Sequence, residues 1–325
     1  MCKGEYILLL EESYGKDLKK INSDENKTIF HIKNESGNGE VIVYELFKGI
    51  EVLYNDFHFK YYSSCQEKTN NIIEINYCKV GRFECEFEKD KCLYMSEGDL
   101  AINSLKNKKT SLSFFPLSHY HGITILLNLD VIDENKDLFK QFGIDINNIS
   151  RCSKIEETIV IRANEKIEHI FSELYVVRED SLIPYLKIKI IEMLFFINRL
   201  DFFSSKEKRP YYTKKQVETV KEIEKVIISD LCKHYTLEEL SKRFDMPLTL
   251  MKKCFKGVYG TSIYNYLKTY RMQVARKLLK EGKLNVTEVA IQIGYLNPSK
   301  FSTTFKNEYG MTPKEFQINV QMDRF

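Results

Sequence analysis

Lysine and hydroxyl side chains gather in two stretches of the C-terminal third, where their spacing suits binding rather than catalysis. Apolar residues four apart define the inward side of a helix in each stretch, with Met251 and Phe255 in the first and Phe301 and Phe305 in the second. The positions that then face outward are Thr249, Lys252, Lys253, Ser299, Lys300, Ser302 and Thr303. The surrounding window, residues 242–306, has 13 Lys/Arg against 3 Asp/Glu, which favours a polyanion as the partner.

The charge of the chain is divided unevenly around this window. The 325 residues carry a formal net charge of +3, but residues 211–325 carry +8 and residues 1–210 carry −5. The 43% hydrophobic and 29% charged composition excludes an intrinsically disordered chain. The length and the charge division together predict two domains, a polyanion-binding module behind an acidic domain that avoids polyanions.

The two stretches are copies of an internal repeat. Residues 237–241 match residues 286–290 at an offset of 49, and residues 255–266 match residues 305–316 at an offset of 50. Thr236 with Glu239 and Asn285 with Glu288 have the spacing of capping boxes, as do Thr312 and Glu315 around Pro313. These start signals predict about seven short helices, and each copy reads as a helix-turn-helix.

A single helix is predicted between the two copies, over Ser262–Glu281. Twenty residues at about 1.5 Å each span roughly 30 Å. Successive major-groove openings on one face of B-DNA are roughly 34 Å apart. A connecting helix of this length would therefore place two recognition helices in adjacent major grooves of double-stranded DNA.

These residues also carry a family resemblance. The run Ala-Ile-Gln-Ile-Gly-Tyr-x-x-Pro-Ser-x-Phe-x-x-x-Phe-Lys at 290–306, followed by Gly-Met-Thr-Pro at 310–313, closely resembles the C-terminal signature of the AraC/XylS transcription regulators. Residues 271–279 look like the linker helix of that family, and the resemblance covers Glu222–Asn319. It implies an AraC-type DNA-binding domain in which the seven outward residues named above contact base edges.

The position of each lysine along its helix separates two kinds of DNA contact. Lysines suit guanine acceptors, and Ser or Thr can reach several bases or a thymine methyl group. Lys256 and Lys306 lie beyond the groove-entering turn and are expected to contact phosphates. The sequence departs from the family where the first recognition helix begins, at Met246-Pro247-Leu248. Thr249 could cap that helix instead, which would start it later and remove the base contact of Thr249.

The N-terminal portion reads as a β domain. Between about Gly39 and Leu127, turn residues separate runs rich in β-branched and aromatic residues, which predicts a sandwich or small barrel. The predicted strands are Val41–Phe47, Ile72–Tyr77, Phe83–Phe87 and Ile123–Leu127. Residues 77–84, 98–101 and 115–124 resemble the cupin-like domain of regulators similar to the pyochelin-responsive regulator. That resemblance implies a small effector, such as a siderophore or another metal-linked compound, bound at residues it does not identify.

The fold class expected is therefore α+β. An N-terminal cupin-like β-barrel with a helical dimerisation segment precedes an all-α domain with two helix-turn-helix units joined by a linker helix. Ile167, Ile170 and Phe171 have the spacing of an amphipathic helix, which Pro184 is expected to end. A second, more apolar helix is expected over Leu186–Leu200. These two helices are expected to cover the sheet or to self-associate. The predicted boundaries are 1–162 for the sensing domain, 163–203 for the dimerisation helices, 204–213 for the linker, 214–325 for the DNA-binding domain, and about 236–257 and 285–307 for its two units.

Neither a catalytic centre nor a metal site is predicted. His119 and His121 have the His-x-His spacing of a cupin metal site, but the further Glu and His at set spacing are missing, so these two are interpreted as surface or core histidines. The remaining histidines, His31, His58, His169 and His234, are expected to form no cluster. Gly81-Arg82 and Gly98-Asp99 are interpreted as strand turns. No catalytic motif appears, so no enzyme activity and no cofactor are expected.

The location and the partners follow from simpler features. Eight cysteines without a Cys-x-x-Cys pair and the lack of a long apolar run predict a soluble, reduced, cytoplasmic protein. A homodimer is expected, with RNA polymerase as a further partner if the protein is an activator. Two other hypotheses stay open: an enzyme with a metal-loaded cupin barrel and a DNA-binding tail, and an architectural DNA-binding protein without an effector.

Overall fold

The computed structural model describes residues 15–65, 71–87, 91–105, 110–151, 158–175, 181–199 and 212–322. The chain divides into two compact units, residues 1–211 and 212–325. Most of the predicted linker, 204–213, and part of the predicted dimerisation segment lie outside the described residues. Among the helices that are described, none has the length and hydropathy needed to cross a membrane.

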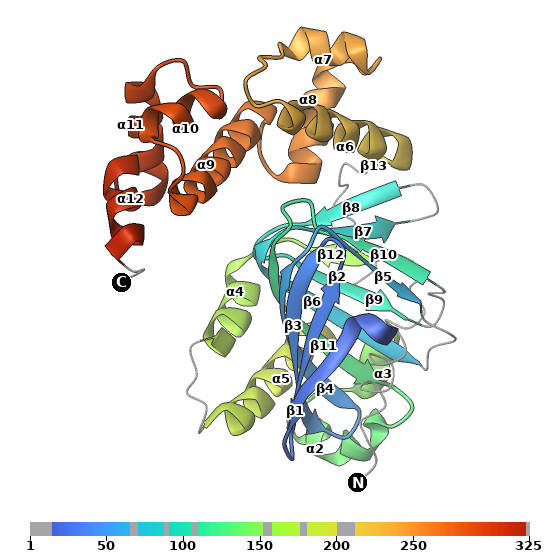
Figure 1. Cartoon of the computed structure of the whole chain (residues 1–325). Helices are drawn as coiled ribbons and strands as arrows, with labels where there is room; N and C mark the ends of the chain where they lie inside the picture. The colour runs from blue at the N-terminus through green and yellow to red at the C-terminus, as the bar shows by residue number, and fades with distance from the viewer. Residues whose placement is uncertain are drawn as a thin grey trace. The chain divides into compact units, whose positions relative to one another are not determined.

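The N-terminal unit contains two antiparallel sheets (Figure 1). The larger one is ordered β1 (Leu18–Ser23), β2 (Lys27–Asn34), β3 (Gly37–Phe47), β4 (Ile50–His58), β11 (Tyr120–Asn128), β6 (Ile72–Gly81), β9 (Leu100–Ser104) and β12 (Ile159–Ile161). The smaller one is ordered β8 (Lys91–Met95), β7 (Phe83–Phe87), β10 (Thr110–Phe114) and β5 (Tyr61–Cys65). The four predicted strands lie within β3, β6, β7 and β11, while β1 and β2 precede the predicted region.

Two separate cores form because successive side chains of a strand point to opposite faces. On β4, Leu53 and Phe57 face a core between the sheets, which also holds Phe30, Tyr120 and Phe115. The opposite face of the same strand carries residues of a second core, in which the sheet packs against helices. That core includes Ile50, Val52, Ile123, Ile125, Phe171, Leu186 and Ile190.

The helices of the N-terminal unit follow β11 in the chain. They are η2 (Ile132–Asn135), α2 (Lys136–Gln141), α3 (Ile146–Ser150), α4 (Glu165–Ser172), η4 (Glu173–Tyr175) and α5 (Leu182–Asn198), with η1 (Gly15–Asp17) before β1. Pro184 does not break a helix as expected, because α5 begins two residues before it and proline is tolerated in a first turn. The buried side of α5 covers the sheet, which is one of the two roles expected for this helix.

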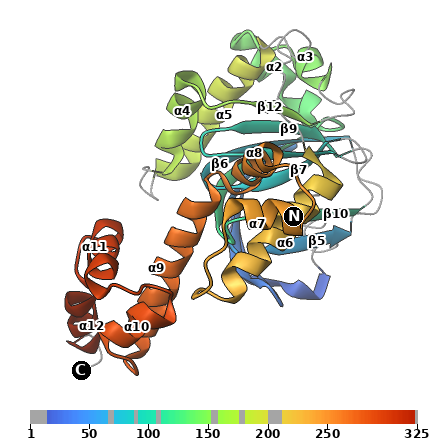
Figure 2. The same ribbon diagram turned by 90° about the horizontal axis from the view of Figure 1, so that it is seen from above.

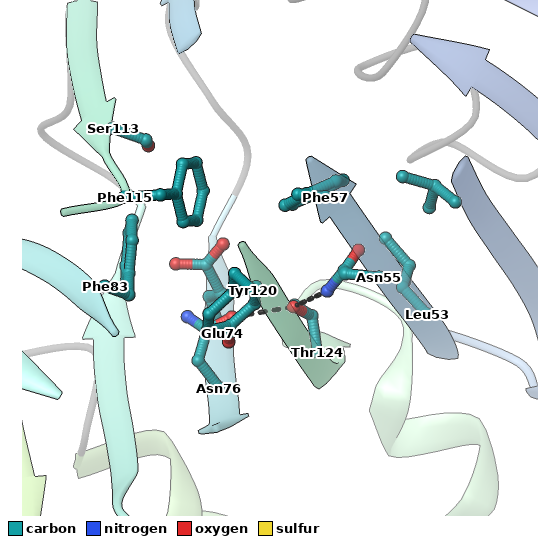
Figure 3. Close-up of a pocket in the computed structure, with 11 residues that line it drawn as sticks. Leu53, Asn55, Phe57, Glu74, Asn76, Phe83, Ser113, Phe115, Tyr120 and Thr124 are labelled. Atoms are coloured by element: carbon teal, nitrogen blue, oxygen red, sulfur yellow. Dashed lines mark hydrogen bonds between the residues drawn. The ribbon is translucent and has the colours of Figure 1, made fainter. Parts of the chain in front are cut away.

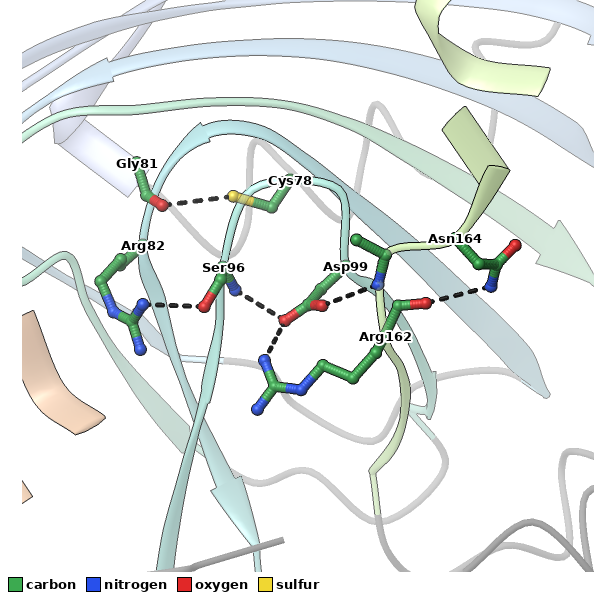
Figure 4. Close-up of polar contacts among 8 residues, drawn as sticks. Cys78, Gly81, Arg82, Ser96, Asp99, Arg162 and Asn164 are labelled. Atoms are coloured by element: carbon green, nitrogen blue, oxygen red, sulfur yellow. Dashed lines mark hydrogen bonds and ion pairs between the residues drawn. The ribbon is translucent and has the colours of Figure 1, made fainter. Parts of the chain in front are cut away.

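A buried carboxylate joins a strand turn to the start of the helical segment (Figure 4). Asp99, which is 1% exposed, accepts hydrogen bonds from the backbone N–H groups of Ser96 at 2.8 Å and Ala163 at 3.1 Å, and it pairs with Arg162. Arg82 donates to the Ser96 hydroxyl at 2.7 Å. Asp99 therefore has a structural role, at a turn where the sequence had suggested one.

The C-terminal unit is helical apart from the short extended stretch β13 (Tyr212–Thr213). Its helices are α6 (Lys214–Ser229), α7 (Leu237–Arg243), α8 (Leu248–Tyr259), α9 (Ile263–Glu281), α10 (Val286–Gln292), α11 (Pro298–Tyr309) and α12 (Pro313–Met322). Figure 2 shows α9 between the α7–α8 pair and the α10–α12 group. The seven helices expected from the sequence are therefore found in the described part of this unit.

Candidate nucleic-acid interface and interior cavity

The first helix pair, α7 and α8, is fixed by its cap and its turn. The Thr236 hydroxyl accepts from the Glu239 N–H at 3.1 Å, and the Thr236 N–H donates to the Glu239 carboxylate at 2.8 Å. In the turn, Asp245 has φ of 46° and the Met246 N–H donates to the Ser241 carbonyl at 3.0 Å. The capping box that the sequence predicted is confirmed, and the turn ends α7 sharply enough for α8 to cross it.

The second pair, α10 and α11, repeats this local structure with one difference. Asn285 and Glu288 form the same reciprocal capping box, and Gly294, with φ of 82°, occupies the place of Asp245. One additional residue lies in the turn between Gly294 and Asn297, which accounts for the change of offset from 49 to 50. Asn297 caps α11 by accepting from the N–H groups of Ser299 and Lys300 at 2.9 and 3.2 Å.

The inward and outward residues lie where helical spacing predicted them. Met251, Phe255, Phe301 and Phe305 are all 0% exposed. Thr249, Lys252 and Lys253 on α8 are exposed, as are Ser299, Lys300 and Thr303 on α11, whereas Ser302 is half-buried. The exposed Lys256 and Lys306 lie one turn further along their helices. Each helix therefore presents a solvent-facing row of cations and hydroxyls.

The suggestion that Thr249 caps α8 is wrong. The helix begins at Leu248, with Pro247 at the N-cap position and no side-chain cap, so Thr249 is already its second helical residue. Proline fixes φ at this position, and its side chain has no atom that could accept from the first N–H groups of α8. The side chain of Thr249 stays exposed in the first turn of α8, in the same row as Lys252 and Lys253.

The hydroxyls on α11 are partly engaged within the helix itself. Thr303 donates to the Ser299 carbonyl at 3.0 Å, and Thr304 donates to the Lys300 carbonyl at 2.8 Å. The Thr303 hydroxyl has one proton, so its remaining capacity toward an external partner is as an acceptor. Its methyl group is the other feature that it can offer to a base.

The connecting helix α9 holds the second pair rigidly. Met272, Ala275 and Leu279 pack with Val289, Ile293, Phe301 and Phe305 in one core. Arg271, only 8% exposed, donates through Nη2 to the Leu231 carbonyl at 2.6 Å, and the buried Glu224 accepts from the Tyr266 hydroxyl at 2.9 Å. The sequence did not single out these two contacts, although Arg271 opens the segment that resembles the linker helix of the AraC/XylS family.

A cavity lies between the two sheets of the N-terminal unit (Figure 3). Its volume is about 80 Å³, and aromatic rings form one wall, with Phe83 and Phe115 stacked at 5.4 Å and Phe57 at 5.5 Å from Phe115. The polar wall is a buried chain in which Asn55 donates to Thr124 at 2.8 Å and Thr124 donates to Asn76 at 2.7 Å. The cavity thus combines an apolar side with ordered polar groups, as small-molecule sites do.

The expectation that His58 belongs to no cluster is wrong. In the antiparallel register of β4 and β11, His121 lies opposite Asp56 and Tyr120 lies opposite Phe57. This pairing brings His58 and Asp56 next to His119 and His121, and one ligand-type atom from each of the four lies within 4.8 Å of the others. The residues on β4 supply the additional histidine and carboxylate that the local sequence around His119 lacks.

One comparison with known proteins falls within the helical unit. A model described as a helix-turn-helix domain matches residues 240–318. The Msm operon regulatory protein of Streptococcus mutans is 26% identical over 58% of this chain and 63% of its own length. The transcriptional activator RhaS of Mannheimia succiniciproducens is 35% identical over 25% of this chain and 30% of its own length. The chain therefore spans less than two thirds of the length of either relative.

Among solved structures, ToxT of Vibrio cholerae O395 aligns with 84% of this chain and 99% of its own, at 14% identity and a TM-score of 0.31. The family match falls within the unit that carries both capping boxes and both exposed rows. Residues 240–318 therefore match a helix-turn-helix domain, and the relatives of this chain are regulators of transcription.

Proposed function

We propose that this chain is a sequence-specific transcription regulator that reads two adjacent major-groove segments with α8 and α11, under the control of a small effector. The observation that carries the proposal is the pair of exposed rows, Thr249, Lys252 and Lys253 on α8 and Ser299, Lys300 and Thr303 on α11, at either end of α9. The 19 residues of α9 correspond to about 28 Å. That length suits helices that enter successive grooves on one DNA face.

A selection of bound sequences by the full chain tests this proposal. The wild-type chain should return a consensus with two half-sites about one helical turn apart. The double variant Lys252→Ala/Lys253→Ala should relax the base preference at one half-site, while Lys306→Ala should weaken binding to all sequences alike. Lys314→Ala, an exposed lysine on α12, serves as the control. A wild-type selection without a consensus would instead support an architectural DNA-binding protein.

The cavity between the sheets supports effector control and limits the size of the effector. Ligand pockets for drug-sized molecules usually measure about 300–1,000 Å³, against about 80 Å³ here. A siderophore-sized effector of a cupin-like barrel would therefore need the two sheets to move apart, whereas a ligand of a few heavy atoms would fit directly. An effector acts by binding one arrangement of the protein better than another, which shifts the populations of the two.

A thermal-shift screen of the full chain addresses this part of the proposal. A ligand of the cavity should raise the melting temperature in proportion to the logarithm of its concentration. Substitution of Asn76 by Leu, which removes the acceptor of Thr124, should abolish the shift without changing DNA affinity in the absence of ligand. A shift that survives this substitution would place the effector elsewhere.

The dimerisation proposed for the helical segment rests on the outer side of α5. Ile188 and Phe195, which are 62% and 36% exposed, are seven residues apart and therefore lie on one side of the helix. Apolar residues exposed in such a row are a usual feature of an association surface. The substitution Ile188→Glu should convert a dimer to a monomer in sedimentation, and an unchanged mass would exclude this surface.

A further inference from the structure

We propose that Asp56, His58, His119 and His121 form a binding site for one divalent transition-metal ion, with Zn²⁺ as the best match. Three imidazoles and one carboxylate are the ligand types that Zn²⁺ takes in proteins. Their donor atoms already lie within 4.8 Å of one another. This site is independent of the DNA-binding role proposed above.

The distances within the cluster are close to those of a coordination shell. Nδ1 of His58 and Nδ1 of His119 are 3.3 Å apart. Oδ1 of Asp56 lies 2.8 Å from Nε2 of His58 and 2.6 Å from Nε2 of His121. With metal–ligand bonds of about 2.0–2.1 Å, the edges of a tetrahedron measure roughly 3.3 Å. The Nδ1–Nδ1 distance equals such an edge, whereas the two distances from Oδ1 are shorter and one of them involves the other nitrogen of His58. Binding of all four ligands to one ion therefore requires rotation of the side chains, each of which already has one donor atom within 4.8 Å of the others.

Hydrogen bonds do not compensate the burial of one carboxylate oxygen of Asp56. Oδ1 of Asp56 is buried, and neither nearby imidazole nitrogen forms a hydrogen bond to it with acceptable geometry, despite the short distances. A buried carboxylate oxygen without a hydrogen bond is costly unless something else compensates its charge. A cation at the point where these atoms converge would supply that compensation.

The three imidazole rings of the cluster lie close to one another. The ring centroid of His119 lies 4.9 Å from that of His58 and 4.9 Å from that of His121. Neutral imidazoles close together are the form that binds a metal ion.

The site differs from the metal centre of a cupin enzyme in the face that it occupies. Phe57 and Tyr120 alternate with the cluster residues along β4 and β11, and both line the cavity between the sheets. The cluster therefore faces away from that cavity, on the same face as Val52 and Ile123, beyond the part of the sheet where the helices pack. Its partial exposure, 52% for His58 and 34% for His121, leaves an ion a path from solvent.

The test is metal binding by the untagged, reduced, chelator-treated full chain. Zn²⁺ competed against a chromophoric chelator should bind at one equivalent, and Co²⁺ should give the visible absorption of a tetrahedral site. His119→Ala/His121→Ala should lose the stoichiometric site, and the conservative variant Asp56→Asn should weaken it at least about tenfold. His31→Ala is the matched control, because His31 pairs with Glu40 on the same sheet but lies outside the cluster.

Each outcome decides the proposal. Loss of the site in both cluster variants with retention in the control supports it, as does a Zn²⁺-dependent rise in melting temperature that occurs only in the wild-type and control chains. Zn²⁺ that binds the cluster variants as tightly as the wild type is held elsewhere, for example at the exposed Cys232, and would overturn the proposal. Absence of stoichiometric binding to the wild type would overturn it as well. Should the double alanine variant fail to fold, Asp56→Asn gives the same decision.

Discussion

Gly294 offers a sharp test of how the second helix pair is held, because Gly310, a left-handed glycine in the same unit, lacks its close contact. Gly294 and Gly310 have φ of 82° and 77°. A Cβ atom on Gly294 would lie 2.1 Å from the Leu231 carbonyl oxygen, whereas a Cβ on Gly310 would have no neighbour within 4 Å. Gly310→Ala therefore measures the backbone cost alone, and Gly294→Ala adds the steric conflict.

The magnitude of each substitution can be worked out from these contacts. Left-handed backbone costs a non-glycine residue about 1–2 kcal/mol, and the stiffer unfolded chain returns about 0.4–1 kcal/mol. Gly310→Ala should therefore destabilise by about 1 kcal/mol. In Gly294→Ala the Leu231 carbonyl must also move away from Arg271 Nη2, which donates to it at 2.6 Å. Loss of a charge-assisted hydrogen bond adds about 1.5–3 kcal/mol, for a total of about 2.5–4 kcal/mol.

Hydrogen exchange followed by mass spectrometry in the full chain is the appropriate assay, because it reports on α10 and α11 separately from the N-terminal unit. Protection of peptides from residues 286–309 should fall about 70- to 900-fold in Gly294→Ala and about fivefold in Gly310→Ala. Because both changes would disturb the same Arg271 contact, Gly294→Ala combined with Arg271→Met should cost less than the sum of the two single changes. Equal losses in the two glycine variants would refute the assigned role of the close approach to Leu231.

Three further predictions concern other contacts. Hydrogen bonds from Thr236 and from Thr312 lower the pKa of Glu239 and Glu315. The stabilisation that these carboxylates provide is therefore complete above the unfolded pKa of about 4.3 and is lost as the pH falls through the lower folded pKa. Glu→Gln at both positions should make the unfolding free energy less dependent on pH over that range, since Thr213 and Gln216 on α6 form an uncharged capping box of the same kind. Asp99→Ala should destabilise the N-terminal unit by about 3–5 kcal/mol in urea unfolding, since it leaves Arg162 and two N–H groups without their acceptor; a loss under 1 kcal/mol would contradict this. Thr303→Val should keep DNA affinity within about threefold, because the Thr303 hydroxyl donates its proton to the Ser299 carbonyl. Lys300→Ala should reduce both the DNA affinity and its dependence on salt. Equal losses of affinity in the two variants would contradict the different roles given to Thr303 and Lys300.

The helical unit could be predicted closely because its signals are local. A capping box spans four residues, and the stripe of Met251 and Phe255 spans a little more than one turn, so each is visible in a short window of sequence. The repeat presents each of these signals twice, and the predicted capping box is present in both copies. The start of α8 was the exception, because a proline N-cap has no side-chain signature and Thr249 looked like the better candidate.

The N-terminal unit was less predictable because its contacts depend on strand register. Asp99 and Ala163 are 64 residues apart in the chain, and Asp56 and His121 are 65 apart, yet both pairs are in contact. A shift of β4 against β11 by one residue would turn Asp56 and His58 into the cavity and expose Phe57. The burial of Phe57 and Tyr120 at 6% and 3% exposure therefore fixes the register that assembles the histidine cluster on the other face. The cavity and the cluster therefore lie on opposite faces of the same two strands, β4 and β11. An ion bound by Asp56 and His121 would link these strands next to Phe57 and Tyr120, which line the cavity.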